Sequence, residues 1–270
     1  MRLFWLWVQA GLRTVVRTPR SAFFTLIFPV VLLVLIEATN SGTVDAPGGK
    51  VDFAQYLTPS LAIFGLCFAC YTSLVFSIPR AREAGILKRV RGTPLEPSVY
   101  LAALIAVALI TGLASVVVMI TVGVAAFGVT LYPHLIPAAL VTLVLGGLCL
   151  ASLGLAVSSL VARADTAPVV ANLTLLPLTF ISGVFAPLQG APEGVKAIAN
   201  VFPLSHLVDA FYATFNPHTA GAGFSAGDLA VLIVWTFIGA RVAARRFRWD
   251  PTPSGSPRRQ GDPDVSPAPG

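Results

Sequence analysis

The sequence predicts an all-α, polytopic membrane protein with six transmembrane helices, on the strength of two observations. First, 56% of its 270 residues are hydrophobic and only 11% are charged, whereas a soluble domain carries about 25% charged residues. Second, the apolar residues gather in long runs without charge, such as 57–78 and 99–127. Uninterrupted apolar runs of roughly 18 residues or more are typical of membrane-spanning helices.

Residues 1–20 are predicted to form an amphipathic helix that lies in the inner membrane interface. At 100° per residue, a basic stripe faces an apolar arc. The stripe contains Arg2, Gln9, Arg13, Arg17 and Arg20, and the arc contains Phe4, Trp5, Val8, Leu12, Val15 and Val16. The alternative is a long first span that begins early, and the spacing of the three later arginines argues against it.

Six apolar stretches follow, and we expect each to cross the membrane. Their bounds are 21–38, 57–78, 98–127, 137–161, 168–186 and 225–243. The third is longer than a bilayer requires, so we expect it to be tilted or to extend beyond the membrane. The fourth is rich in small residues that allow close helix packing, namely Gly146, Gly147, Ala151, Gly154 and Ser158.

The distribution of Lys and Arg predicts that both termini are cytoplasmic. With that orientation sixteen Lys or Arg residues lie inside, and only Lys50 and Lys196 lie outside. Such an excess marks the cytoplasmic side. Residues 249–270 are rich in Pro, Ser, Gly and charge, and we expect them to form a disordered cytoplasmic tail. Because the basic residues border apolar runs, the net positive charge does not indicate nucleic acid binding.

A charged segment, residues 80–96, separates the second and third spans. Pro79 is expected to end the second span, and a short helix is expected over 80–91, closed by Gly92. The sequence Thr93-Pro-Leu-Glu96 reads as a capping box that opens the third span. On the short helix Glu83 falls in the middle of an apolar arc formed by Ile86, Leu87 and Val90.

This arc predicts that the segment docks into a groove of a partner. The alternative is an intrahelical pair between Glu83 and either Lys88 or Arg80, which would add roughly 0.2–0.5 kcal/mol. The length of the segment, about three helical turns, exceeds what a simple connection needs. We therefore expect a cytoplasmic component to press against it.

Other chemistry is sparse in this sequence. It has no GxxxxGK[ST] phosphate-binding loop, and spans two to five contain no Asp, Glu, Lys, Arg or His for a proton relay. Cys67, Cys70 and Cys149 fall inside spans and are expected to be packing residues rather than metal ligands. His206 and Asp209 lie one turn apart, and they could form a pair or simply contact water.

Two segments resemble a known family. Arg82-Glu-Ala-Gly-Ile-Leu-Lys-Arg-Val-Arg-Gly-Thr-Pro-Leu95 resembles the cytoplasmic signature of permeases in the type-2 ATP-binding-cassette (ABC) export family. The stretch Phe180–Leu188, with Pro192-Glu193 and Phe202–Ala210, is similar to the segment after the family's fifth span. The likeness covers residues 1–248 and is nearest to multidrug permeases of the daunorubicin-resistance type. Ile86 replaces the family's commoner Thr, and Gly92 replaces its commoner Ala.

The resemblance implies roles for particular residues. Residues 80–91 would be the coupling helix that seats in the ATPase, and residues 1–20 would be a connecting helix beside it. Residues 187–215 would form outer re-entrant half-helices that include Pro203, His206 and Asp209. The ATPase contacts would come from Arg82, Glu83, Gly85, Ile86, Leu87, Lys88, Arg89, Arg91, Thr93 and Pro94.

The resemblance also implies the membrane subunit of an ABC exporter in the bacterial cytoplasmic membrane. The chain would bind no cofactor or metal, and two copies of a partner ATPase would use ATP and Mg²⁺. A second permease copy would complete the pore, as a homodimer or with a paralogue. The expected substrate is hydrophobic or amphipathic, a drug or lipid-like molecule, whose efflux would give antibiotic resistance. Polysaccharide export, a non-transporting membrane scaffold and an ion-coupled transporter remain alternatives.

Overall fold

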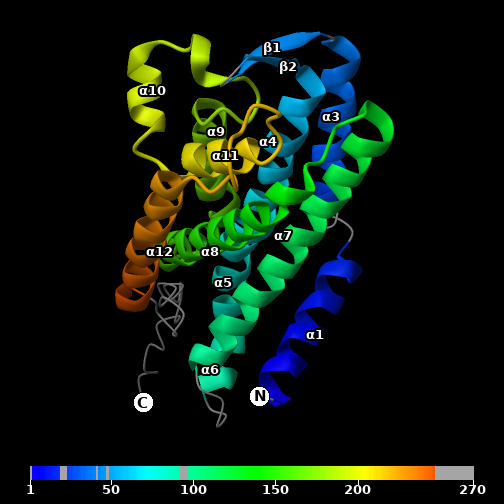
Figure 1. Ribbon diagram of the computed structural model, residues 1–270. Coiled ribbons are helices and arrows are strands. Elements are labelled where there is room, and N and C mark those ends of the chain that lie inside the picture. Colours follow the sequence, from blue (N-terminus) through cyan, green and yellow to red (C-terminus); the bar gives the residue numbers. More distant parts are fainter. Residues whose placement is uncertain (1, 19–22, 41, 47–48, 92–96, 247–270) are drawn as a thin grey trace, which may run out of the picture.

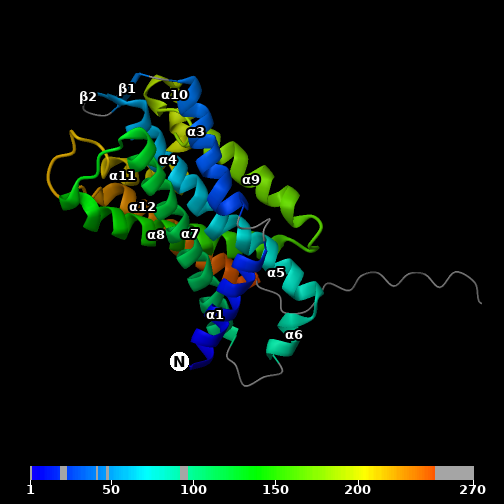
Figure 2. The same cartoon turned by 90° about the vertical axis from the view of Figure 1, so that its right-hand side faces the viewer.

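The computed structural model describes residues 2–18, 23–40, 42–46, 49–91 and 97–246. These residues form a bundle of helices with one small β-hairpin (Figure 1). The N-terminus and α6 lie at one end of the bundle, which we call the basic end. The β-hairpin and α10 lie at the opposite end, which we call the hairpin end (Figures 1 and 2). The expectation of an all-α polytopic fold is confirmed, with the hairpin as an unpredicted addition.

The first helix, α1 (Arg2–Arg17), lies beside the first half of α7 (Pro97–Phe127) and runs in the same direction. Val8 packs with Ala103 and Val107, and a Cβ on Gly11 would meet the side chain of Val107. The helix thus follows a long apolar helix rather than crossing it, as the two views show (Figures 1 and 2). Phe4, Val8, Leu12 and Val15 of its apolar arc pack on α7, whereas Trp5 and Val16 are exposed. The amphipathic pattern does not specify this division.

A π-helical turn (Phe23–Ile27) leads into α3 (Phe28–Thr39), and the β-hairpin follows. Its strands are β1 (Thr43–Ala46) and β2 (Gly49–Asp52). They are antiparallel, with Val44 opposite Val51. Val51 is buried against Tyr56 and Tyr212, so the hairpin packs on the end of the bundle.

The centre of the bundle is one continuous helix from Phe53 to Glu83. It comprises α4 (Phe53–Cys67), a π-helical turn (Phe68–Thr72) and α5 (Ser73–Glu83). The expected helix break at Pro79 is wrong, because α5 continues past Pro79 for one turn, whereas the end of the second span near residue 78 stays a prediction. Ile78 and Pro79 are both buried, and packing around a membrane helix offsets the lost backbone hydrogen bond.

The prediction of a single helix over 80–91 is also wrong, because Gly85 divides this segment into two helices. Gly85 has a φ of +68° and ends α5, and the amides of Ala84 and Gly85 bond to the carbonyls of Arg80 and Arg82. Such a left-handed glycine is a common helix terminator. The helix α6 (Ile86–Arg91) then begins in a new direction. The capping box at 93–96 and Gly92 lie outside the described residues.

A short 3₁₀ turn and two α-helices follow α7. A 3₁₀ turn (Pro133–Leu135) precedes α8 (Ile136–Leu160), and α9 (Ala167–Ile181) follows. The small-residue face of α8 is confirmed as a packing face, because Gly146, Gly147 and Gly154 are buried against neighbouring helices. The helix α9 ends at Ile181 rather than at residue 186, and Gly183 follows with a φ of +77°.

The last elements cover the hairpin end and return toward the basic end (Figure 1). They are a 3₁₀ turn (Leu188–Gly190), α10 (Glu193–Ala199), α11 (Pro203–Ala213) and α12 (Ala226–Arg246). Within the described residues, four helical segments are long and apolar enough to cross a membrane: Phe53–Glu83, Ser98–Phe127, Pro133–Leu160 and Ala226–Arg246. The apolar helices Thr25–Thr39 and Ala167–Ile181 are shorter, so six spans remain a prediction.

Candidate functional site

The charged segment at the basic end forms a compact turn that we call the basic hairpin, residues 80–91. Its two halves present different surfaces. Lys88 and Arg89 are exposed, and Ile86 is partly exposed. Leu87 is fully buried and packs with Ala81 and Tyr100. The predicted apolar arc is therefore divided, because Leu87 anchors the hairpin to its own bundle and leaves a cationic outer surface.

The end of α5 is held to the loop between α8 and α9, residues 161–166. Arg82 is 3% exposed, and its Nη1 donates a hydrogen bond of 3.0 Å to the carbonyl oxygen of Val161. Glu83 accepts a hydrogen bond of 2.7 Å at Oε1 from the backbone amide of Ala164. The partner of the Glu83 carboxylate is thus this loop, rather than Lys88 or Arg80.

These two hydrogen bonds come from adjacent residues of α5 and are made to two backbone positions, Val161 and Ala164, of one short loop. We call them the loop clamp. The loop is itself braced, because the Arg163 guanidinium makes two hydrogen bonds to the Asp165 carboxylate, at 3.2 and 2.8 Å. Since α8 ends and α9 begins at this loop, the loop clamp joins the end of α5 to both helices.

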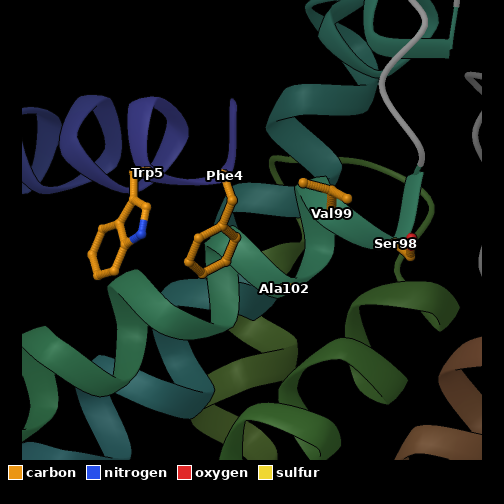
Figure 3. A pocket seen from close by; sticks show the side chains of 5 residues that line it. All are labelled: Phe4, Trp5, Ser98, Val99 and Ala102. Carbon is orange, nitrogen blue, oxygen red and sulfur yellow. The ribbon is translucent and has the colours of Figure 1, made fainter. Parts of the chain in front are cut away.

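The helix α1 flanks the basic hairpin through α7. Trp7 makes an edge-to-face contact with Tyr100, with ring centroids 5.2 Å apart. Nearer the N-terminus, Phe4 and Trp5 point toward the start of α7 and border a shallow hollow with Ser98, Val99 and Ala102 (Figure 3). Arg13 and Arg17 are exposed, whereas Arg20, Thr93 and Pro94 lie outside the described residues and Arg91 ends α6.

A second polar cluster joins α11 to the start of α12 at the hairpin end. His206 Nδ1 lies 2.7 Å from Asp228 Oδ1, and His206 Nε2 lies 3.0 Å from the carbonyl oxygen of Asn200. The hydroxyl of Ser225 donates to the other oxygen of Asp228. Of the two readings left open by the sequence, neither a His206–Asp209 pair nor simple contact with water describes His206, which pairs with Asp228. Pro203 is buried and begins α11.

The chemistry of this cluster determines the charge of His206. A carboxylate and a carbonyl are both acceptors, so this geometry favours a proton on each ring nitrogen and hence the cationic imidazole. Burial alone would lower the pKa of His206. The hydrogen bonds to Asp228 and Asn200, with the charges of Asp228 and Asp209, outweigh burial and raise that pKa.

Asp209 responds to the same surroundings in a different way. Its side chain reaches the surface, but crowding by protein atoms removes water from the carboxyl and raises its pKa to about 6. The negative charge of Asp228 adds to this effect, and His206 opposes it. Asp209 therefore takes up a proton more readily than an ordinary aspartate, although it does not pair with His206.

Sequence reasoning missed a third polar group, Gln55 at the start of α4. Its amide nitrogen donates to the carbonyls of Thr130 and Phe215, and its oxygen accepts from the Thr130 amide. The side chain thus joins the α7–α8 connection to the end of α11. The available signal was a lone amide just before a long apolar run, which is a position that suits a helix end as well as a contact.

The described ranges contain no group of three or more His, Cys, Asp or Glu side chains that could hold a metal ion. Cys67, Cys70 and Cys149 are buried and are not in disulfide bonds. The thiol of Cys70 donates a hydrogen bond of 3.5 Å to the carbonyl oxygen of Ala108, and the three cysteines belong to the apolar central core. These cysteines act in packing.

The fold defines the class of the protein as a multi-pass helical membrane protein. A protein-family model described as "ABC-2 type transporter" matches residues 2–216, and the chain belongs to that family. Membership implies a membrane setting.

Two curated relatives give more detail. The chain is 30% identical to nodulation protein J of Rhizobium leguminosarum bv. viciae over 109 residues, which is 40% of this chain and 42% of the relative. It is 23% identical to the probable multidrug ABC transporter permease YbhR of Escherichia coli K12 over 160 residues, 59% of this chain and 43% of the relative. The matches thus span less than half of each relative.

Proposed function

We propose that this chain is the membrane subunit of an ABC exporter in the cytoplasmic membrane, with both termini inside and the basic hairpin docked on a separate ATPase. One observation carries the proposal: the basic hairpin combines an exposed cationic surface with the loop clamp on the loop between α8 and α9. Lys88 and Arg89 offer the surface. Arg82 and Glu83 connect it to the rest of the bundle.

The arrangement suggests how movement would pass through the chain. ATP and Mg²⁺ bound to the partner ATPase would drive its closure, and the hairpin would move with it. Leu87 holds α6 against Tyr100 of α7, so the hairpin cannot shift without α7. The loop clamp carries the same displacement to α8 and α9. A single input thereby reaches three helices of the bundle.

The proposed substrate is hydrophobic or amphipathic, a drug or lipid-like molecule moved outward. The relative YbhR is named as a probable multidrug permease, which supports this class. A second candidate is export of a different class of molecule such as a polysaccharide, because the other relative, nodulation protein J, is not named as a multidrug permease. Large apolar side chains exposed on α9 and α12, among them Leu173 and Phe237, support contact with lipid or with a second permease copy.

The test uses the full chain, purified from the membranes of its native host with its ATPase. Lys88→Glu/Arg89→Glu is expected to reduce the amount of ATPase recovered at least about tenfold, because the substitution inverts the charge of the proposed contact. Arg245→Glu is the matched control, an exposed cation near the end of α12. Unchanged recovery with the double variant would contradict docking at the hairpin, and stimulation of ATP hydrolysis by candidate drugs would test the substrate class.

A further inference from the structure

A cavity of about 490 Å³ lies between α1, α5 and α7. It follows the central helix from Ala69 to Arg80, which is about 16 Å at 1.5 Å per residue. Trp7 and Thr14 border it from α1, and Tyr100 borders it from α7. The cavity is therefore elongated and runs along the helices rather than across them.

The charge of the cavity is concentrated at one end. Among the described residues that line the cavity, Arg80 is the only charged one. Arg80 is exposed, and within the described residues its guanidinium forms no ion pair. The hydroxyls of Thr14, Ser77 and Thr111 bond to carbonyls of their own helices. The remaining wall thus presents mainly carbon atoms to an occupant.

The position of Arg80 matches the level of lipid headgroups. It follows directly on the apolar stretch that ends at Ile78. Cationic residues at the end of a membrane span lie where the hydrocarbon meets the polar headgroups. From Arg80 the cavity extends back along the apolar helix toward Ala69, in the direction that the acyl chains of the inner leaflet run.

We propose that this cavity binds an anionic phospholipid of the inner leaflet, with one acyl chain in the apolar part and the phosphate on Arg80. The cavity has a cation at one end and apolar side chains along its length, and an anionic phospholipid has a phosphate at one end and a hydrocarbon chain along its length. This match favours the lipid as the occupant. Basic pockets between membrane helices on the cytoplasmic side bind anionic headgroups. Such a lipid would connect α1 to α5. The assignment of the cavity to the inner leaflet rests on the distribution of Lys and Arg along the chain. Lipid binding at this cavity does not require the ATPase.

The experiment is a lipid titration of the purified full chain in neutral detergent, without ATPase or nucleotide, followed by native mass spectrometry. Phosphatidylglycerol and phosphatidylcholine with identical acyl chains are compared. The wild-type chain is expected to retain phosphatidylglycerol more tightly. Arg80→Gln should weaken that binding about fivefold, the value of one cation near an anionic lipid, and Arg80→Lys should preserve the preference.

Two further variants locate the site. Arg17→Gln removes an exposed arginine of α1 that does not line the cavity, and it should leave the preference intact. Thr14→Phe fills the apolar part and should reduce retention of both lipids. Equal retention of the two lipids by the wild type would overturn the proposal. So would an unchanged preference in folded Arg80→Gln, or unchanged retention in Thr14→Phe. Neither result would bear on the docking of an ATPase at Lys88 and Arg89.

Discussion

At the scale of single residues, Glu83 is the clearest case of a side chain whose partner lies far away in the sequence. Its carboxylate accepts the Ala164 amide, so Glu83→Ala should expose that amide to exchange. Hydrogen exchange of a peptide covering 161–166 is expected to accelerate about three- to tenfold, the equivalent of one modest hydrogen bond. Glu83→Gln retains an acceptor oxygen and should exchange like the wild type. Equal rates in all three proteins would show that the loop clamp does not form.

His206 gives a prediction about pH. Because its pKa is raised in the folded chain, its contribution to stability is complete below its ordinary pKa of 6.5 and is lost as pH rises through the raised value. Thermal unfolding in detergent should show wild-type stability falling by about 1–2 kcal/mol toward pH 9. His206→Gln should lack this fall. An identical pH profile for the two proteins would contradict the cationic pair with Asp228.

Asp209 provides the control for that experiment, since it titrates in a different range. Its pKa is raised to about 6, so the folded chain favours the protonated form and loses stability as pH rises from about 4 to 6. Asp209→Asn should remove the pH dependence only in this lower range. It should leave the loss toward pH 9, which belongs to His206, unchanged.

At the scale of elements, the direction of the basic hairpin depends on Gly85. Its φ of +68° is unfavourable for residues with a Cβ, and no atom would obstruct that Cβ. Gly85→Ala should therefore cost about 1–2 kcal/mol through backbone strain alone, measured by thermal unfolding, and should reduce recovery of the ATPase by straightening the hairpin. Gly85→Asn tolerates this conformation better and should behave more like the wild type. Equal effects of the two substitutions would contradict the strain argument.

The packing of α8 predicts an asymmetry between two of its glycines. A Cβ on Gly154 would lie 2.8 Å from the carbonyl oxygen of Tyr71, which is backbone. A Cβ on Gly146 would instead meet the flexible side chain of Leu207. Gly154→Ala should thus destabilise the chain by about 1–3 kcal/mol, and Gly146→Ala by less. Comparison of the two by thermal unfolding in detergent tests this, and a reversed order would contradict it.

The elements also show where sequence reasoning succeeds and where it stops. The third span was predicted at 98–127 and the helix runs from Pro97 to Phe127, since a long uncharged run has few alternatives in a membrane. The predicted end of the helix at Pro79 was wrong, because the helix end depends on tertiary packing at Ile78 and on the left-handed backbone of Gly85. Neither the packing at Ile78 nor the backbone conformation at Gly85 can be predicted from local helix propensity.

At the scale of the whole molecule, the partners across long sequence distances could not be read from the sequence. Glu83 and Ala164 are brought together by the arrangement of α5, α8 and α9, and His206 meets Asp228 because α11 packs on α12. A single sequence shows which chemical groups are present but not which of them pair with one another. The class of protein was nevertheless predictable, because apolar composition and short family-like motifs are local properties of a sequence.

The last prediction concerns the orientation of the whole chain. Lys88→Cys and Lys50→Cys introduce exposed thiols at the basic end and at the hairpin end, while the native Cys67, Cys70 and Cys149 are buried and give little background. An impermeant maleimide added to intact cells should label only Lys50→Cys, and labelling of Lys88→Cys should require opened membranes. This follows from the concentration of Lys and Arg on one side of the spans. Labelling of both positions from outside would place the hairpin beyond reach of a cytoplasmic ATPase, because a docking surface must face its partner.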